Sequence, residues 1–154
     1  MIRLSKLSDY GILLMSRFAT VGPEVVLTAR ELAERSGVSL PTVSKLLKVL
    51  HRSELLFSQR GVNGGYRLSR AADSISITDI IAAIDGPVTI TECSKVNPVH
   101  KCDLEVECPL RGHWMKINAV VVQSLSALTL RDMVMPASAL LTDRIAPKHD
   151  NALS

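Results

Sequence analysis

The stretch "LTARELAERSGVSLPTVSKLLKVL", residues 27–50, decides the fold because it predicts two short helices joined by a tight turn. Thr28, with Glu31 three residues later, matches the capping box that begins many helices. The first helix should therefore span about residues 29–35. Gly37 favours the backbone conformation that ends a helix, so the chain should turn there.

Ser39 can cap the second helix, and Pro41 falls in its first turn, where a missing N–H costs little. Apolar residues with helical spacing predict one buried face: Val43, Leu46, Leu47 and Leu50. The outer face is polar and carries Thr42, Ser44, Lys45, Lys48 and Arg52. Two helices in this arrangement predict a helix-turn-helix. The alternative is an ordinary helical hairpin with solvated lysines.

The next stretch, "LLFSQRGVNGGYRLSR" at residues 55–70, predicts a β-hairpin. Its strands should be residues 55–59 and 66–69, with a glycine-rich turn between them. Arg60 and Arg67 flank that turn. A basic hairpin after a helix-turn-helix indicates a winged helix, which binds DNA. A phosphate-binding nucleotide loop is excluded, because no Gly-Lys-Ser/Thr follows the glycines.

Helices should flank this unit on both sides. "LSDYGILLMSRFAT", residues 7–20, predicts a helix that Ser8 could cap. "SISITDIIAAIDGP", residues 74–87, predicts another that ends at Gly86. The DNA-binding domain should therefore occupy residues 1–87.

The segment "LRGHWMKINAVVVQSLSALTLRDMVM", residues 110–135, predicts one long helix. Its apolar stripe is nearly heptad: Leu110, Trp114, Ile117, Val121, Leu125 and Leu128. A helix of this length exceeds what one small core can cover, so we expect a dimerisation helix in a homodimer. The alternative is a helix that folds back onto its own domain. Residues 136–154 show no clear period and should form a mobile or loosely packed tail.

Composition and charge agree with a protein that binds a polyanion through one half. Of the 154 residues, 47% are hydrophobic but only 3% aromatic, so the core should be aliphatic. Residues 1–75 carry 11 Lys and Arg against 6 Asp and Glu, a charge of +5; residues 76–154 carry 7 against 9, a charge of −2. No membrane span or secretory signal is apparent, which predicts a cytoplasmic protein with reduced thiols.

All three cysteines lie in one charged loop, "CSKVNPVHKCDLEVEC", at Cys93, Cys102 and Cys108. Three thiols cannot all pair as disulfides, so metal binding or redox chemistry is favoured. Iron–sulfur clusters are held by thiolates, usually four, and another side chain can replace one of them. Structural zinc, with His100 or His113 as fourth ligand, is disfavoured by the C-x8-C-x5-C spacing. A thiol switch without a cluster remains a further alternative.

Five features occur in one order: "LSDYG", "VSLPTVSKLLKVL", "RGVNGGYRLSR", "ITDIIAAIDGP" and the cysteine loop. Over residues 1–135 the chain resembles the winged-helix regulator family that includes the IscR-type iron–sulfur repressor and the NsrR-type nitric-oxide sensor. Within that family it is most similar to the regulator of the SUF iron–sulfur assembly system.

The resemblance implies a homodimer crossed through the long helix and a cluster held by the three cysteines, with 2Fe-2S favoured over 4Fe-4S. A fourth ligand has two candidates. Asp9 matches the NsrR-type aspartate that reaches across the dimer. The IscR-type histidine position is occupied here by Arg111, and the nearest histidine is His113.

The expected fold is thus mostly α with a small β wing, in four parts: a winged helix-turn-helix DNA-binding domain at 1–87, a cysteine cluster loop at 88–109, a dimerisation helix at 110–135 and a tail at 136–154. Ser39, Thr42 and Lys45 should meet base edges of a palindromic promoter site. Phosphate contacts should come from Lys48, Arg52, Arg60 and Arg67.

The expected function is a cluster-sensing regulator, acting as a repressor, of iron–sulfur cluster assembly genes. The sequence predicts no enzyme, because no nucleophile elbow, metal-binding helix with glutamate or cofactor loop accompanies the cysteines. An iron–sulfur scaffold or carrier is the remaining alternative.

Overall fold

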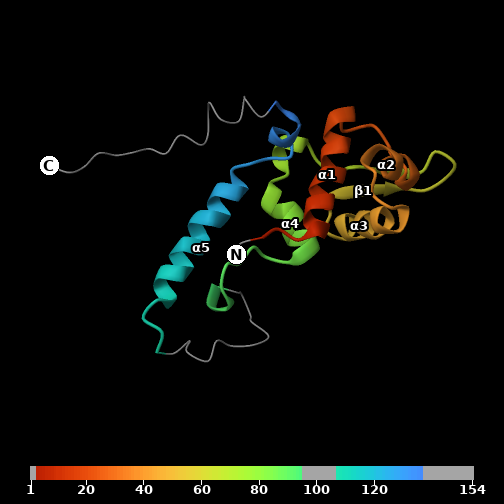
Figure 1. The fold of residues 1–154 in the computed structure, drawn as a ribbon. Coiled ribbons are helices and arrows are strands. Elements are labelled where there is room, and N and C mark those ends of the chain that lie inside the picture. Colours follow the sequence, from red (N-terminus) through yellow and green to blue (C-terminus); the bar gives the residue numbers. More distant parts are fainter. Residues whose placement is uncertain (1–2, 95–106, 137–154) are drawn as a thin grey trace.

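The computed structural model describes residues 3–94 and 107–136 and is mostly helical, with one small antiparallel sheet, as predicted. In Figure 1 the helices α1 to α4 and the two strands form one body, and α5 lies along α4 at its side. The elements are α1 (Lys6–Val21), α2 (Ala29–Ser36), α3 (Leu40–Arg52), β1 (Leu56–Gln59), β2 (Gly65–Leu68), η1 (Ala72–Ser74), α4 (Ile77–Asp85), η2 (Glu92–Ser94), α5 (Arg111–Ser126) and η3 (Asp132–Val134). Cys102 and the predicted tail beyond Pro136 lie outside the described residues.

The predicted helix-turn-helix is confirmed as α2 and α3. The Thr28 N–H donates to the Glu31 carboxylate (2.8 Å), and the Glu31 N–H donates to the Thr28 hydroxyl (3.2 Å), which completes the capping box. The Thr28 hydroxyl also donates to that carboxylate (2.8 Å), and the hydrogen bonds from the Thr28 backbone and then from its hydroxyl lower the pKa of Glu31 below its ordinary value. Gly37 ends α2 with a φ of 71°, and its N–H donates to the Ala33 carbonyl. Ser39 precedes α3 as expected, but its side chain makes no capping bond.

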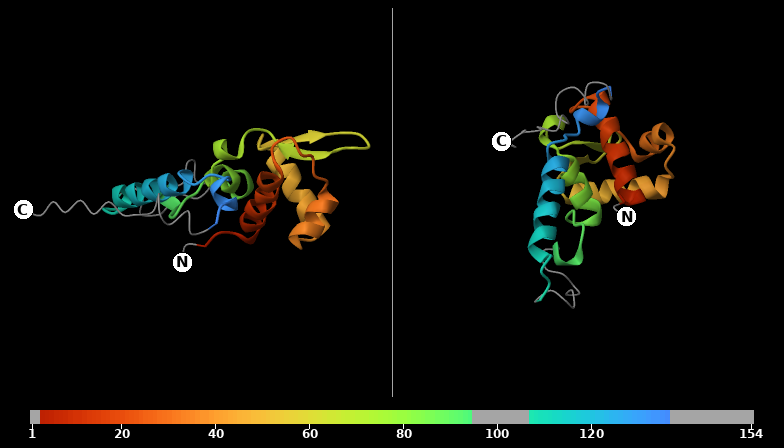
Figure 2. Two further views of the ribbon diagram at one scale, coloured as in Figure 1. Left: turned by 90° about the horizontal axis from the view of Figure 1, so that it is seen from above. Right: turned by 60° about the vertical axis from the view of Figure 1, so that its left-hand side comes forward.

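The wing is the antiparallel pair β1 and β2, which projects beyond the helices in the left view of Figure 2. The two strands pair from Leu56 with Leu68 to Gln59 with Gly65. Leu27, just before α2, exchanges two 2.9 Å backbone hydrogen bonds with Tyr66. A Cβ at Gly65 would lie only 2.6 Å from the Leu27 carbonyl oxygen, so this close approach needs glycine. The wing is therefore fastened to the start of the helix-turn-helix.

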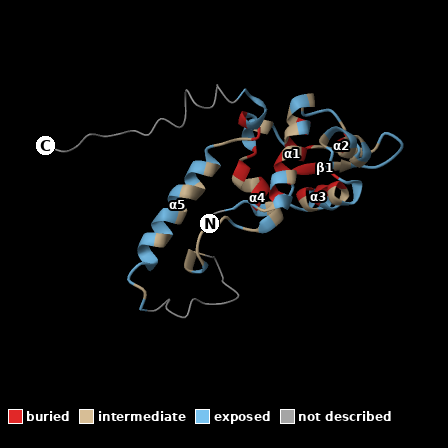
Figure 3. Cartoon of the chain, in the orientation of Figure 1, coloured by how far each residue is buried: buried red, intermediate tan, exposed pale blue. Residues whose placement is uncertain are grey.

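The hydrophobic core lies where α1, α3, α4 and the strands meet, and Figure 3 colours its buried residues red. Its largest fully buried members are aliphatic apart from one aromatic ring: Leu14, Met15, Phe18, Leu32, Leu46, Leu47, Leu50, Leu55, Leu56, Ile75, Ile80 and Leu130. The apolar face predicted for the second helix of the pair belongs to this core. The predicted aliphatic core is confirmed.

The prediction that Ser8 caps the first helix is wrong. Ser5 is the cap, because its hydroxyl accepts the Ser8 N–H at 3.0 Å. Ser8 is instead fully buried, and its hydroxyl donates to Asp85 at the end of α4 (2.6 Å). One turn on, a Cβ at Gly11 would lie 2.1 Å from the Ile84 side chain. The helices α1 and α4 therefore cross in close contact, and tertiary packing decides the role of Ser8.

The prediction of one helix over residues 110–135 is also wrong, because α5 ends at Ser126. The chain then returns to its own domain: the Ile77 N–H donates to the Leu128 carbonyl (2.9 Å) and the Leu130 N–H to the Ile75 carbonyl (2.8 Å). Leu130 is fully buried in the core. The physical reason for the break is this burial, together with reciprocal hydrogen bonds between Thr129 and Asp132, the first residue of η3.

Candidate DNA interface and cysteine site

The outer face of α3 presents the polar residues that the sequence predicted. Lys45, Lys48 and Arg52 are exposed on it, while the opposite face is buried. Ser39 and Thr42 lie at the N-terminal end of α3, with their hydroxyl oxygens 2.9 Å apart. This face combines hydroxyl groups at one end with positive charges along its length, which suits contact with both base edges and phosphates.

The two wing arginines differ in their surroundings. Arg60 is exposed at the end of β1. The Arg67 guanidinium lies over the Phe57 ring, 4.8 Å from its centroid, and the two residues are paired across the strands. Phe57 is itself 49% exposed. Stacking therefore gives Arg67 a preferred position on the wing, while Arg60 extends into solvent.

A pocket of about 450 Å³ lies between the start of α1 and the start of α3. Lys6 and Tyr10 from α1 line it next to Ser39 and Thr42. The Lys6 ammonium lies 5.5 Å from the centroid of the Tyr10 ring. Sequence reasoning missed both residues, although the basic first half of the chain and the tyrosine in "LSDYG" were available as signals. They extend the polar surface of α3 towards α1.

The short helix η2, which carries Cys93, packs against α5 on the other side of the molecule from the wing (Figure 1). Cys93 is in η2, half-buried, with its Sγ 3.2 Å from the Thr91 hydroxyl. Cys108 is half-buried just before α5, and neither thiol is in a disulfide. Cys102 lies outside the described residues.

The two candidates for a fourth ligand are both exposed within one chain. Asp9 is in the first turn of α1, and His113 is in the first turn of α5. Among residues 3–94 and 107–136, no three Cys, His, Asp or Glu side chains gather closely enough to hold a metal ion. Within one chain, neither Asp9 nor His113 forms a metal-binding group together with Cys93 and Cys108.

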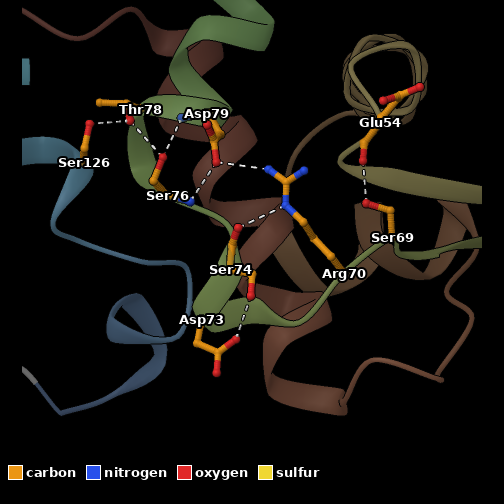
Figure 4. A network of polar contacts seen from close by, with 9 residues as sticks. All are labelled: Glu54, Ser69, Arg70, Asp73, Ser74, Ser76, Thr78, Asp79 and Ser126. Atoms are coloured by element: carbon orange, nitrogen blue, oxygen red, sulfur yellow. Dashed lines mark hydrogen bonds and ion pairs between the residues drawn. The ribbon is translucent and has the colours of Figure 1, made fainter.

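Two polar features attach α5 to the winged domain, and sequence reasoning found neither. The Asn118 side chain contacts the backbone between α4 and η2, accepting the Ile90 N–H at 3.0 Å. At the C-terminal end of α5, the Ser126 hydroxyl lies 2.9 Å from the Thr78 hydroxyl at the start of α4 (Figure 4). Each contact joins residues about 30 to 50 positions apart, so no local sequence pattern signals it.

A family model described as Rrf2, iron-dependent transcriptional regulator, matches residues 4–136. The chain belongs to the Rrf2 family. It is accordingly a DNA-binding transcriptional regulator of the winged-helix type, as its helix-turn-helix and wing predicted. No helix within the described ranges is long and apolar enough to cross a membrane.

Two curated Rrf2 relatives align over most of this chain. Protein rrf2 of Nitratidesulfovibrio vulgaris is 28% identical over 137 residues, covering 89% of this chain and 90% of the relative. The HTH-type transcriptional regulator IscR of Vibrio cholerae is 29% identical over 144 residues, covering 93% of this chain and 82% of the relative. Both resemblances extend through the wing and the cysteine segment.

Solved Rrf2 structures show the same fold. The global cysteine regulator CymR of B. subtilis matches with a TM-score of 0.67 and 27% identity, covering 87% of this chain and 97% of that one. IscR of T. potens matches with a TM-score of 0.65 and 29% identity, covering 86% of each chain. The resemblance to an IscR-type winged-helix regulator is therefore confirmed.

Proposed function

We propose that this Rrf2 protein is a homodimeric repressor of iron–sulfur cluster assembly genes, of the SUF type, that senses a cluster bound by its own cysteines. One observation supports the sensing role above all. The free, half-buried thiols of Cys93 and Cys108 lie in the segment that joins the DNA-binding domain to α5. A ligand held there would contact one of the connections through which α5 could influence the winged domain.

The donor set fits an iron–sulfur cluster. Thiolates are the usual ligands, and Cys93 and Cys108 are neither paired with each other nor fully buried. Cys93, Cys102 and Cys108 would supply three ligands, and we propose a 2Fe-2S rather than a 4Fe-4S cluster. The fourth ligand would be Asp9 of the partner subunit, or alternatively His113. When bound, such a cluster supplies sensitivity to iron supply and to oxidants.

The exposed apolar surface of α5 supports the homodimer. None of the α5 residues is buried, and three of its apolar side chains are about half exposed: Met115 (52%), Ile117 (45%) and Val120 (56%). Beside α5, a groove of about 440 Å³ is lined by apolar residues that include Ile81, Val121 and others of α4 and α5. An apolar helix face of this extent favours contact with a second copy of the chain.

In the proposed complex, each protomer places α3 in the major groove of one half of a palindromic promoter site. Ser39, Thr42 and Lys45 lie nearest the start of α3 and would contact base edges. Further contacts would go to phosphates, from Lys48, Arg52, Arg60 and Arg67. Binding or loss of the cluster would change how the two half-sites are engaged.

Anaerobic purification tests this proposal directly. The protein should absorb visible light and contain iron and acid-labile sulfide, and Cys93→Ala should lose that absorption. Ser124→Ala, which alters an exposed side chain of α5 that is no proposed ligand, is the matched control. Gel retardation should then show that apo and cluster-loaded protein differ in affinity for a promoter site. Absorption retained in Cys93→Ala, with unchanged DNA affinity, contradicts the proposal.

A regulator that uses its thiols without a cluster is the second candidate. It is favoured by the similarity to the global cysteine regulator and by the presence of two uncrosslinked thiols in the described part of the chain. Here oxidation of the thiols would change DNA affinity. Protein purified without iron, sulfide or zinc, whose DNA affinity still responds to a mild oxidant, would establish this function instead.

A further inference from the structure

We propose that Asn118 is a positioning residue for the cysteine site, because its side-chain amide fastens the segment leading to Cys93 onto the helix that follows Cys108. The inference rests on the proposed function of the cysteines. Asn118 itself touches neither thiol in the structure and would act only through the backbone that it holds.

The Asn118 amide makes two contacts with the same short stretch of backbone. Its Oδ1 accepts the Ile90 N–H at 3.0 Å, and its Nδ2 donates to the Val88 carbonyl at 3.5 Å. One side chain thereby supplies an acceptor and a donor to residues two apart, as a neighbouring β-strand would. Val88 and Ile90 are both half-buried against α5, so their backbone groups have limited access to water.

Cys93 follows this fastened stretch within three residues. The link is a tight turn: the Ser94 N–H donates to the Thr91 carbonyl at 3.0 Å, and the Ser94 and Thr91 hydroxyls lie 2.8 Å apart. The same Thr91 hydroxyl lies 3.2 Å from the Cys93 sulfur. The turn also packs on α5. The position of the Cys93 thiol therefore depends on where residues 88–90 are held.

Cys108 is attached to the same helix by a backbone hydrogen bond at its N-terminal end. Its carbonyl accepts the N–H of Arg111, the first residue of α5, at 3.3 Å. Asn118 lies seven residues further along that helix, which is two turns. Both described cysteines are thus placed relative to α5, one through the chain and one through the Asn118 amide. Holding both ends of the intervening loop lowers the entropy lost when the thiols bind one ligand.

The proposal depends on the Asn118 amide, because its oxygen accepts from one backbone group while its nitrogen donates to another. Asn118→Leu keeps the approximate size and removes both hydrogen bonds. Asn118→Asp keeps the acceptor for the Ile90 N–H but places a second acceptor against the Val88 carbonyl. Ser124→Ala is the matched control, since the Ser124 hydroxyl bonds only the Val120 carbonyl within α5 and is exposed. Circular dichroism verifies that all three remain folded.

Two measurements test the two steps separately. In apo protein, the amide of Ile90 should exchange with solvent about tenfold faster in Asn118→Leu than in wild type, as expected when one hydrogen bond is lost. In anaerobically loaded protein, transfer of iron to a chelator should be several-fold faster in Asn118→Leu and less so in Asn118→Asp. Ser124→Ala should match wild type in both. Faster exchange at Ile90 with unchanged iron transfer overturns the positioning role.

Failure of the proposed function gives a different result. If wild-type protein binds no iron, the cluster hypothesis fails, and the rate at which iodoacetamide alkylates Cys93 then decides the positioning role. If Asn118 positions Cys93 through residues 88–90, the Cys93 thiol should react several-fold faster in Asn118→Leu, because the segment opens more often. An unchanged alkylation rate in Asn118→Leu overturns the inference.

Discussion

The Nη2 of Arg70 lies 3.0 Å from the Oδ2 of Asp79, so the residue that leaves the wing is tied to the first turn of α4 (Figure 4). The same carboxylate oxygen accepts the backbone N–H of Ser76 at 3.0 Å and so caps α4. The Ser76 hydroxyl in turn lies 2.8 Å from that of Thr78, which reaches Ser126 at the end of α5. The first turn of α4 is therefore where the wing and α5 are both attached.

Removal of the arginine should have a small effect on stability. Both side chains of the Arg70–Asp79 pair are 42% exposed, and ion pairs in such positions contribute little. We expect Arg70→Ala to lower the free energy of unfolding by less than about 1 kcal/mol, and 1 M salt to reduce the difference. Urea denaturation measures this. Arg60→Ala, with the same change in charge, is the control; an equal loss there would show that the pair itself contributes nothing.

Two glycine substitutions should have opposite signs. Gly65→Ala would place its Cβ 2.6 Å from the Leu27 carbonyl oxygen, which is backbone and cannot move aside easily. We expect a loss of about 1–3 kcal/mol, as for other overpacked sites. Gly112→Ala, in the first turn of α5 with nothing within 4 Å, should instead stabilise by a few tenths to about 1 kcal/mol. Thermal unfolding compares them, and a neutral Gly65→Ala would contradict the close approach of wing and Leu27.

The return of the chain after α5 can be tested through Leu130. This side chain is fully buried, so Leu130→Ala should cost about 2–5 kcal/mol in unfolding free energy. Leu110→Ala, on a side chain that is 53% exposed just before α5, is the control and should leave the stability of the winged domain nearly unchanged. Denaturant unfolding at fixed protein concentration measures both. A tolerated Leu130→Ala would favour the uninterrupted helix over residues 110–135.

The proposed dimer surface predicts a change in mass. Ile117→Glu with Val120→Glu adds two charges to the exposed apolar face of α5 and should yield a monomer, since burying an unpaired charge is unfavourable. Sedimentation equilibrium gives the mass, and circular dichroism should show helix content close to that of wild type. Ser124→Glu, a charge added at an exposed polar position of the same helix, is the control. A double variant with unchanged mass would place the interface elsewhere.

The wing should contribute charge to DNA binding rather than sequence preference. Arg60 is exposed at the end of β1, where it could meet a phosphate. Arg60→Ala should weaken binding to all sequences alike and lower the slope of log affinity against log salt by about 0.9 for each wing. Titration of labelled promoter DNA over several salt concentrations measures the slope. A shift in preferred sequence would instead indicate that Arg60 contacts bases or groove shape.

The elements that could be predicted from sequence are those with local signals. The capping box of Thr28 and Glu31, the helix-ending Gly37 and the glycine-rich wing turn each act within a few residues, and all three were found in the structure. Ser8 was misassigned because Ser5 and Ser8 can both cap a helix, and only contact with distant Asp85 decides between them. Local chemistry therefore predicts the helix-turn-helix well.

The end of α5 and its contacts with the winged domain depend on long-range contacts, which the apolar periodicity of the sequence does not reveal. The apolar stripe continues past Ser126 to Leu128, but the latter belongs to a chain segment bonded to Ile77. Asn118 appears in sequence as an ordinary polar position on a helix, and its partners are about 30 residues away. For the cysteine site, the sequence predicted the thiols, while the group that orders the segment before Cys93 was visible only in the fold.

The paired hydrogen bonds between Leu27 and Tyr66 have a mechanical consequence for regulation. They join the residue just before the helix-turn-helix to the wing, so we expect α3 and the wing to move together as one rigid unit. A change in the position of α5 should then leave the angle between α3 and the wing unaltered. In a dimer, such a change would alter only the spacing and tilt between the two winged domains. Affinity for DNA sites with different half-site spacings would measure that effect.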